Sequence, residues 1–396
     1  MKHAAATILF VASHAAARSA GAADFAFPVP SDDRWHYPFN FTPGARPAAS
    51  VFSTFGDPDF DGFNDRDAAF IVAWETGGVI LPGLALESYD VCSVEVTLRN
   101  APGAAWRVDG SVDEWFTFDF NGDGGINRDG ISRGAPGDRD GESTDVDAGR
   151  PIELFGVGFG PTYDYATWVE DDAYAGAECD LVSQVCHNFP RDPYPFVYQP
   201  GTAAKLHVED SIKGFHNAGA NPPLCNAPTQ ICPFTPVPWA VGMPINYVPN
   251  NQPTPFDVVF DVNLSLSEGN VRKYFQEQLR GGRLFVEITT LLFADFMSSQ
   301  TGYPVFYTRD ATGPGVRAPH LLIRLQSDPI GDLDGDSLVH LSDFKVARQC
   351  IAGPGRTPSV PPGRGIKTCL CAFDADADAD VDLRDLARIQ NEYTGN

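Results

Sequence analysis

Hydrophobic and polar residues alternate along several short segments between positions 51 and 326, which is the pattern of half-buried β-strands. The alternation is clearest at residues 94–98 and 258–262. Glycine, proline, asparagine and aspartate separate these segments, as turns require. The pattern predicts strands at 68–74, 91–98, 152–157, 205–208, 256–264, 283–290 and 320–325.

A helical period occurs in the same region at 270–279, and Gly281-Gly282 ends it. Because strands predominate and are irregularly spaced, we predict a mainly β fold, with an antiparallel β-sandwich over 23–326. Residues 179–251 read as a cysteine- and proline-rich insertion, and the aromatic-rich stretch 23–50 is predicted to pack on the body. Residues 317–325 resemble the closing strand of jelly-roll domains, which implies a jelly-roll-like sandwich.

Beyond residue 326 the pattern changes to two acidic segments of equal length, followed by apolar helical periods at 341–351 and 383–393. Each segment has aspartate at positions 1, 3, 5 and 12. Calcium takes about six to eight oxygen ligands, and this spacing directs carboxylates and the position-7 carbonyl toward one point. The predicted calcium ligands, with Leu338 and Asp380 contributing backbone carbonyls, are Asp332, Asp334, Asp336, Leu338, Asp343, Asp374, Asp376, Asp378, Asp380 and Asp385.

Two properties of these loops bear on their affinity and stability. Position 6, a left-handed turn that suits glycine, is Ser337 in one loop and Ala379 in the other, at a cost of about 1–2 kcal/mol each. Without a cation, each pair of carboxylates ~4 Å apart opposes folding by about 4 kcal/mol at an effective dielectric constant near 20. We therefore expect residues 327–396 to need calcium for order.

The two loop–helix units resemble the type I dockerin domain, on the strength of residues 331–336 with Asp343 and of residues 374–385. The resemblance implies a small α-helical calcium module that docks a secreted protein onto a cohesin-like or cell-surface partner, often in polysaccharide degradation. At loop positions 10 and 11, where the family often has Ser-Thr for cohesin recognition, this chain has Leu341-Ser342 and Leu383-Arg384.

Charge and the N-terminus indicate where the protein works. The 396 residues carry a formal net charge of −24, which disfavours nucleic acid and anionic membranes and favours divalent cations. A basic start, an apolar core at 4–12 and the motif Ala20-Gly21-Ala22 predict a signal peptide over 1–22, and thus a secreted or cell-surface protein. No other stretch has the ~20 apolar residues of a membrane span.

The eight cysteines are interpreted as disulfide partners, in keeping with export. Cys350 has two possible partners across the C-terminal linker, Cys369 and Cys371. Cys92 either has a distant partner or is a buried thiol. The pairs Cys179 with Cys186 and Cys225 with Cys232 are close in sequence.

Further acidic segments at 57–67, 119–130 and 138–141 are candidate calcium loops or plain acidic turns. Glu170-Asp171-Asp172 is a candidate for a catalytic carboxylate or a solvated turn, and no second carboxylate at glycosidase separation is identified. Three functions stay open. The body binds a polysaccharide or surface partner, or it is a glycoside hydrolase, as the dockerin resemblance implies, or the chain is a structural surface or matrix protein.

Overall fold

The structure is a computed structural model of the chain, in which two compact units are separated at Leu325/Gln326. It describes residues 23–37, 40, 42–52, 68–101, 108–112, 151–160, 162–172, 192–208, 211, 234–245, 255–290, 303–326, 330–333, 338–356, 358, 366–375 and 380–394. Among these residues, no helix is long and apolar enough to cross a membrane.

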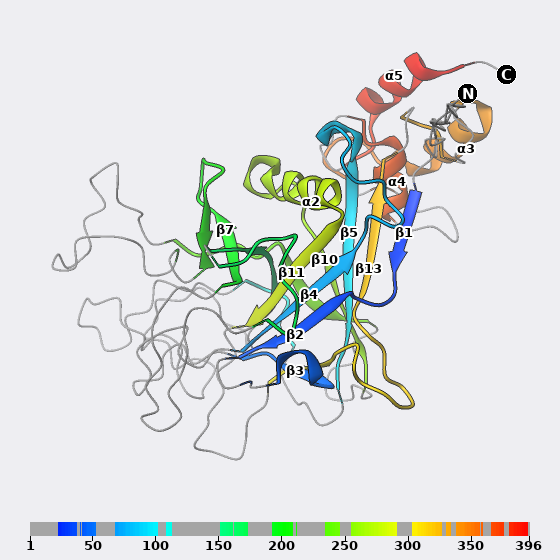
Figure 1. Cartoon of the computed structure of the whole chain (residues 1–396). Helices are drawn as coiled ribbons and strands as arrows, with labels where there is room; N and C mark the ends of the chain where they lie inside the picture. The colour runs from blue at the N-terminus through cyan, green and yellow to red at the C-terminus, as the bar shows by residue number, and fades with distance from the viewer. Residues whose placement is uncertain are drawn as a thin grey trace, which may run out of the picture. The chain divides into compact units, whose positions relative to one another are not determined.

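The first unit, Asp24–Leu325, is built on a large antiparallel sheet, so the prediction of a mainly β, antiparallel fold is confirmed. The sheet has 11 strands, with the order β1-β13-β5-β10-β9-β6-β11-β4-β2, and β7 and β8 branch from β6 (Figure 1). A separate pair joins β12 to β3. The strands are β1 Ala23–Phe27, β2 Asp32–His36, β3 Ala48–Ser50, β4 Ala69–Glu75, β5 Val91–Arg99, β6 Ile152–Gly158, β7 Tyr194–Tyr198, β8 Lys205–His207, β9 Ala240–Pro244, β10 Asp257–Asp261, β11 Arg283–Thr290, β12 Val305–Tyr307 and β13 His320–Leu325.

The sheet is strongly curled, and the connection between its first two strands shows why it must be. β1 and β2 occupy opposite ends of the strand order, yet only residues 28–31 join them. A connection of this length spans at most about 18 Å, whereas nine flat strands ~4.8 Å apart would place the two edges about twice as far from each other. In Figure 1 the chain passes directly from β1 into β2 across the front of the sheet.

The largest apolar core lies under helix α2 (Asn270–Gly281), which contacts β11 and β5. Val271, Tyr274, Phe275 and Leu279 are buried on one face of this helix, at the spacing of an amphipathic helix. The Tyr274 hydroxyl donates to the carbonyl of Phe285 at 2.9 Å and accepts from a backbone N–H of β6 at 3.2 Å. Among the described residues of this unit, the 3-10 helices are η1 Pro43–Ala45, η2 Leu86–Ser88 and η4 Leu266–Gly269.

All seven predicted strands and the predicted helix at 270–279 are present, with bounds within a few residues of those expected. The aromatic stretch 23–50 packs on the body as predicted, in part as β1 and β2, while Phe39 and Phe41 lie outside the described residues. Strands β7, β8 and β9 fall within the segment interpreted as an insertion and pair with the main sheet. Only β8 among them was predicted.

The described part of the second unit, which contains Gln326–Asn396, has three helices: α3 Leu341–Cys350, α4 Ile366–Phe373 and α5 Leu383–Glu392. Two of them were predicted within one residue of their observed ends, while α4 was not. The apolar residues of all three helices and of the two loops share a small core, whose buried members are Val339, Ala347, Cys350, Cys369, Ala372, Phe373, Val381 and Ile389.

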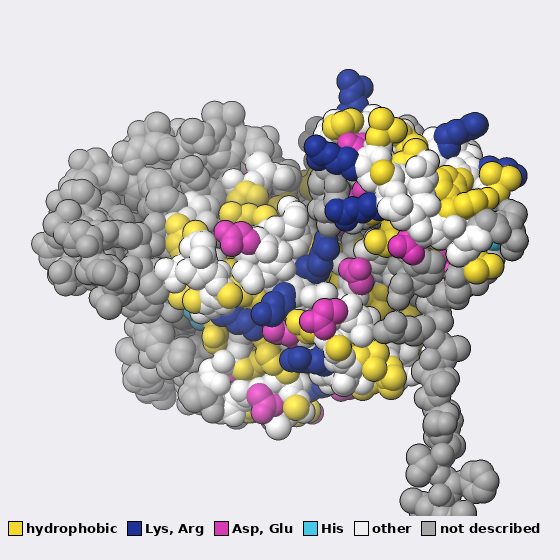
Figure 2. Space-filling view, turned by 90° about the horizontal axis from the view of Figure 1, so that it is seen from above, with side chains coloured by type: hydrophobic (Ala, Val, Ile, Leu, Met, Phe, Trp, Pro, Cys, Tyr) yellow, Lys and Arg dark blue, Asp and Glu magenta, His cyan; other side chains and the backbone are white. Residues whose placement is uncertain are grey.

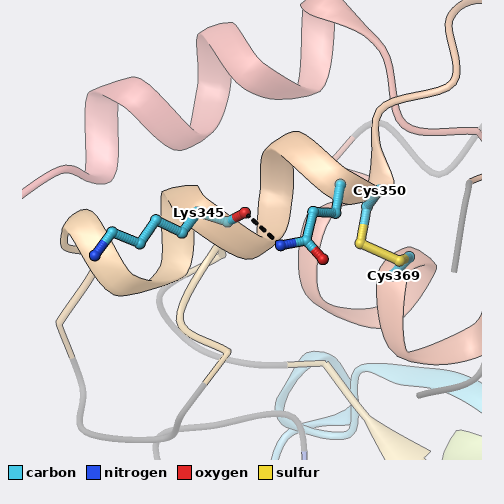
Figure 3. Close-up of a disulfide and its surroundings, with 4 residues drawn as sticks. Lys345, Cys350 and Cys369 are labelled. Carbon is cyan, nitrogen blue, oxygen red and sulfur yellow. Dashed lines mark hydrogen bonds between the residues drawn. A yellow bond between two sulfur atoms is a disulfide. The ribbon is translucent and has the colours of Figure 1, made fainter. Parts of the chain in front are cut away.

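A disulfide between Cys350 and Cys369 joins the C-terminal end of α3 to α4 (Figure 3). This decides between the two partners considered for Cys350. Cys92 and Cys371 are also disulfide-bonded, so Cys92 is not a thiol. Disulfides of this kind persist in an oxidising or extracellular environment. The other four cysteines lie outside the described residues.

Candidate metal centre

The two acidic loops lead into α3 and α5, and the structure describes each of them except residues 334–337 and 376–379. Asp332, Leu338 and Asp343 of the first loop, and Asp374, Asp380 and Asp385 of the second, are described. The predicted ligands Asp334, Asp336, Asp376 and Asp378 lie outside the described residues, so the arrangement at positions 3 and 5 stays a prediction.

The position-12 aspartate closes each loop on itself in the same way. In the first loop, Asp343 Oδ1 accepts from the N–H of Leu333 at 2.9 Å and its Oδ2 from the N–H of His340 at 3.0 Å. In the second loop, the equivalent oxygens of Asp385 accept from the N–H of Ala375 at 2.7 Å and of Asp382 at 2.8 Å. One carboxylate thereby ties positions 2 and 9 of its own loop together.

The position-8 carbonyl of each loop accepts a backbone hydrogen bond from the segment that follows the helix of the other loop. The carbonyl of Val339 in the first loop accepts from the N–H of Thr394, two residues beyond α5, at 3.0 Å. The carbonyl of Val381 in the second loop accepts from the N–H of Ala352, two residues beyond α3, at 3.1 Å. Each loop is therefore held by the chain that follows the helix of the other, and the two halves repeat the same structure.

Most of the described aspartates of these loops are buried, whereas Asp374 at position 1 of the second loop is half-buried. Asp332, Asp343 and Asp385 are at most 1% exposed, and Asp380 and Asp382 are below 5%. In the second loop, carboxylate oxygens of Asp380, Asp382 and Asp385 lie within 4.8 Å of one another. Ionised carboxylates taken out of water this close together repel strongly, unless a cation or hydrogen-bond donors compensate their charge.

Asp382 is a functional candidate that the predicted ligand set did not include. It occupies position 9, where its side chain also caps α5, since Oδ1 accepts from the N–H of Arg384 at 2.6 Å. Position 9 of the first loop is His340, whose Nδ1 lies 2.7 Å from Asp343 Oδ2. The two loops thus share a backbone arrangement but differ in charge at position 9, with an acid in one and an imidazole in the other.

The side chain of Asp380 has a role beyond the backbone carbonyl predicted for it. Its Oδ2 accepts a short hydrogen bond from the N–H of Gly355, in the turn after α3. The donor set of the second loop consists of oxygen atoms only, with no sulfur or nitrogen among its clustered ligand atoms. Oxygen-only donors suit hard cations such as calcium or magnesium, rather than zinc or copper.

The other acidic segments provide less evidence for a functional site. Those at 57–67, 119–130 and 138–141 lie outside the described residues. Glu170 is buried, and both of its oxygens are engaged within the protein: Oε2 accepts from the N–H of Asp33 at 2.8 Å, and Oε1 pairs with Arg309. Glu170 therefore caps the edge strand β2, which is a structural role, while its neighbour Asp171 is exposed.

Comparison of the chain with protein-family models and with curated proteins finds no match to either.

Proposed function

We propose that the protein is an exported calcium-binding protein, in which a dockerin-like C-terminal unit serves docking or stabilisation and a jelly-roll-like β-sandwich body binds glycan. The supporting observation is the repeated closure of the two C-terminal loops, by the position-12 aspartates Asp343 and Asp385 and by the reciprocal hydrogen bonds at position 8. Two loops built alike, each preceding a helix, are the arrangement that paired calcium loops need.

The residues present fit calcium, which would supply positive charge among otherwise repelling carboxylates. Asp332 and Asp343 would hold it in the first loop. In the second loop the described ligands would be Asp374 at position 1 together with the clustered Asp380, Asp382 and Asp385. Each position-12 carboxylate has accepting capacity beyond its two N–H bonds, because a carboxylate offers about four lone-pair sites. The undescribed aspartates at positions 3 and 5 are expected to complete both ligand sets.

The outer surfaces of α3 and α5 support the docking role. Leu341 and Leu383, both at loop position 10, are 57% and 73% exposed. Lys345, Arg384 and Arg388 are exposed on the same two helices. Figure 2 shows hydrophobic and basic side chains together on the visible face of this unit. An exposed mixture of large apolar and basic side chains is typical of a protein-binding surface, and it fits a cohesin-like or cell-surface partner with acidic groups.

The test is a calcium titration of the full chain by isothermal calorimetry, after treatment with a chelator. Two sites are expected, and Asp332→Ala and Asp374→Ala should each remove one. Glu392→Ala, which changes an exposed acid on α5, is the matched control and should keep both sites. Absence of calcium-dependent heat in the unchanged chain, or two full sites in both loop variants, would refute the proposal.

Thermal unfolding gives a second readout that does not depend on heats of binding. A cation that binds only the folded state stabilises it by about 2.7 kcal/mol at a concentration 100-fold above Kd. The C-terminal unit should therefore melt at a higher temperature in calcium, and this shift should shrink in each loop variant but not in Glu392→Ala.

A further inference from the structure

A pocket of about 410 Å³ opens on the body, far from the cation loops in sequence. This volume falls in the range of small-molecule sites, roughly 300–1,000 Å³. Four chain segments build it: the turn after β1, the end of β5, the start of β10 and the approach to β13. Its lining residues are Pro28, Val29, Thr97, Arg99, Asp257, Arg317, Ala318 and His320.

Strand register explains why the polar members of this set meet. Thr97 is directly opposite His320 on β13, and Arg99 is opposite Asp257 on β10. Partners in register project from the same face of a sheet, and residues two apart on a strand share that face. The alternate β5 residues, including Leu98, are buried in the core, so these four polar side chains project outward together.

The pocket carries an excess of positive charge on a strongly acidic chain. Asp257 bridges two arginines: Oδ1 lies 2.9 Å from Arg99 Nη1 and Oδ2 lies 2.9 Å from Arg317 Nη1. Two guanidinium groups against one carboxylate leave a net charge of about one positive unit before His320 is counted. The whole chain has a formal net charge of −24, so this local excess stands against the prevailing charge.

The two arginines differ in exposure and in the contacts that hold them, which suits capture of a ligand. The side chain of Arg99 is 18% exposed and is also fixed by Nε donating to the carbonyl of Gly315 at 3.3 Å. The side chain of Arg317 is 69% exposed and is fixed only at its Asp257 contact, among the contacts described. A guanidinium binds a carboxylate through two parallel N–H donors, and Arg317 can present such a pair without breaking a buried interaction.

We infer that this pocket binds a sugar that carries a carboxylate, a hexuronate unit. Arg317 and Arg99 would bind the carboxylate, while Thr97, Asp257 and His320 offer donors and acceptors for hydroxyl groups. Pro28, Val29 and Ala318 supply an apolar wall for the C–H face of the ring. The inference rests on the glycan binding proposed for the body, narrows it to an anionic sugar, and is independent of the calcium loops.

The test is titration of the full chain with D-galacturonate, followed by ligand-observed NMR or calorimetry. Two control ligands separate the contributions of the carboxylate and of the sugar ring to binding: D-galactose lacks the carboxylate, and acetate lacks the sugar. Each should bind at least tenfold more weakly than galacturonate. Arg317→Ala should lower galacturonate affinity at least tenfold, and Arg317→Lys should recover part of it, because lysine keeps the charge but not the paired donors.

Arg324→Ala is the control, since Arg324 lies on β13 outside the pocket, where it pairs with Asp24. It should leave galacturonate binding unchanged. Equal binding of galactose and galacturonate, equal binding of acetate, or full affinity in Arg317→Ala would overturn the inference. Tight, Arg317-independent binding of galactose would leave glycan binding standing while this pocket fails, and calcium titration of the same samples tests the loops separately.

Discussion

The buried carboxyl of Asp33 offers a sharp test of the energetics of the sheet edge. Asp33 lies on β2, the last strand of the sheet, and is 2% exposed. Its Oδ2 accepts from the N–H of Arg309 at 2.6 Å, while its own N–H donates to Glu170. Burial, reinforced by the nearby negative charge of Glu170, raises the pKa of Asp33 from 3.8 to about 7.

The sign of the resulting pH dependence follows from linkage. Because the folded state raises this pKa, it favours the protonated carboxyl, and the stabilisation is complete below pH ~4 and lost as the pH rises to about 7. A shift of about three pH units at 1.36 kcal/mol each corresponds to roughly 4 kcal/mol. Asp33→Asn cannot ionise, and its amide oxygen can still accept from the Arg309 N–H. The variant should therefore match the unchanged protein near pH 4 and be more stable by roughly 4 kcal/mol at pH 8.

The assay is urea unfolding followed by tryptophan fluorescence between pH 4 and 8. All six tryptophans belong to the body, so the signal reports on this unit alone. Differences between variants cancel the contribution of the rest of the chain to the pH dependence. Asp171→Asn, at an exposed carboxyl nearby, is the control and should show no such trend. A stability difference between Asp33→Asn and the unchanged chain that is the same at pH 4 and pH 8 would refute the reasoning.

Three further predictions concern single side chains. Gly331→Ala should destabilise the C-terminal unit by about 1–2 kcal/mol or more, measured by thermal unfolding, because Gly331 has φ +98° and a Cβ there would lie 2.7 Å from Ile389. Cys369→Ser should lower the stability of that unit by about 3 kcal/mol through loss of the bond to Cys350, and a reductant should then have a smaller effect on the variant than on the unchanged chain. Tyr274→Phe should cost the body about 1–3 kcal/mol in urea unfolding, because it leaves a buried backbone carbonyl and N–H without their hydroxyl partner.

The sequence predicted the elements whose pattern is local. Strands such as β5 and β11 show their alternating or continuous apolar pattern within the segment itself, because most of their residues are buried, and their distant polar contacts lie at a terminal arginine of each strand. The helices α3 and α5 follow aspartates whose spacing the loop itself requires, so both were predicted to within a residue. These elements follow from periodicity alone.

Elements that depend on distant partners were missed. The sequence of β2, Asp-Asp-Arg-Trp-His, is as polar as that of a typical turn. It forms a strand nevertheless, because Asp32 pairs with Arg283 at 2.7 Å and Asp33 accepts a hydrogen bond from Arg309. β9 contains Gly242, which a strand pattern disfavours, but a Cβ there would lie 2.7 Å from Phe260. In both strands a contact with residues far along the chain decides the structure.

The same distinction applies to the candidate sites. Aspartate spacing identified both cation loops, and Asp382 could have been added as a ligand from its position in the loop. The reciprocal bonds from Thr394 and Ala352 depend on how the two halves meet, which spacing does not encode. The pocket beside Arg317 depends on the register of three strands and on a turn more than 200 residues away, so no local motif marks it.

The position of β1 has a consequence for the order in which the body forms. This strand, the first of the described chain, pairs only with β13, the last strand of its unit, and Asp24 joins Arg324 across that pair at 2.9 Å. During synthesis β1 must therefore wait for nearly the whole body to emerge before its partner exists. Contacts so distant in sequence slow folding, so closure of this edge is expected to be a late event, after the central strands have paired.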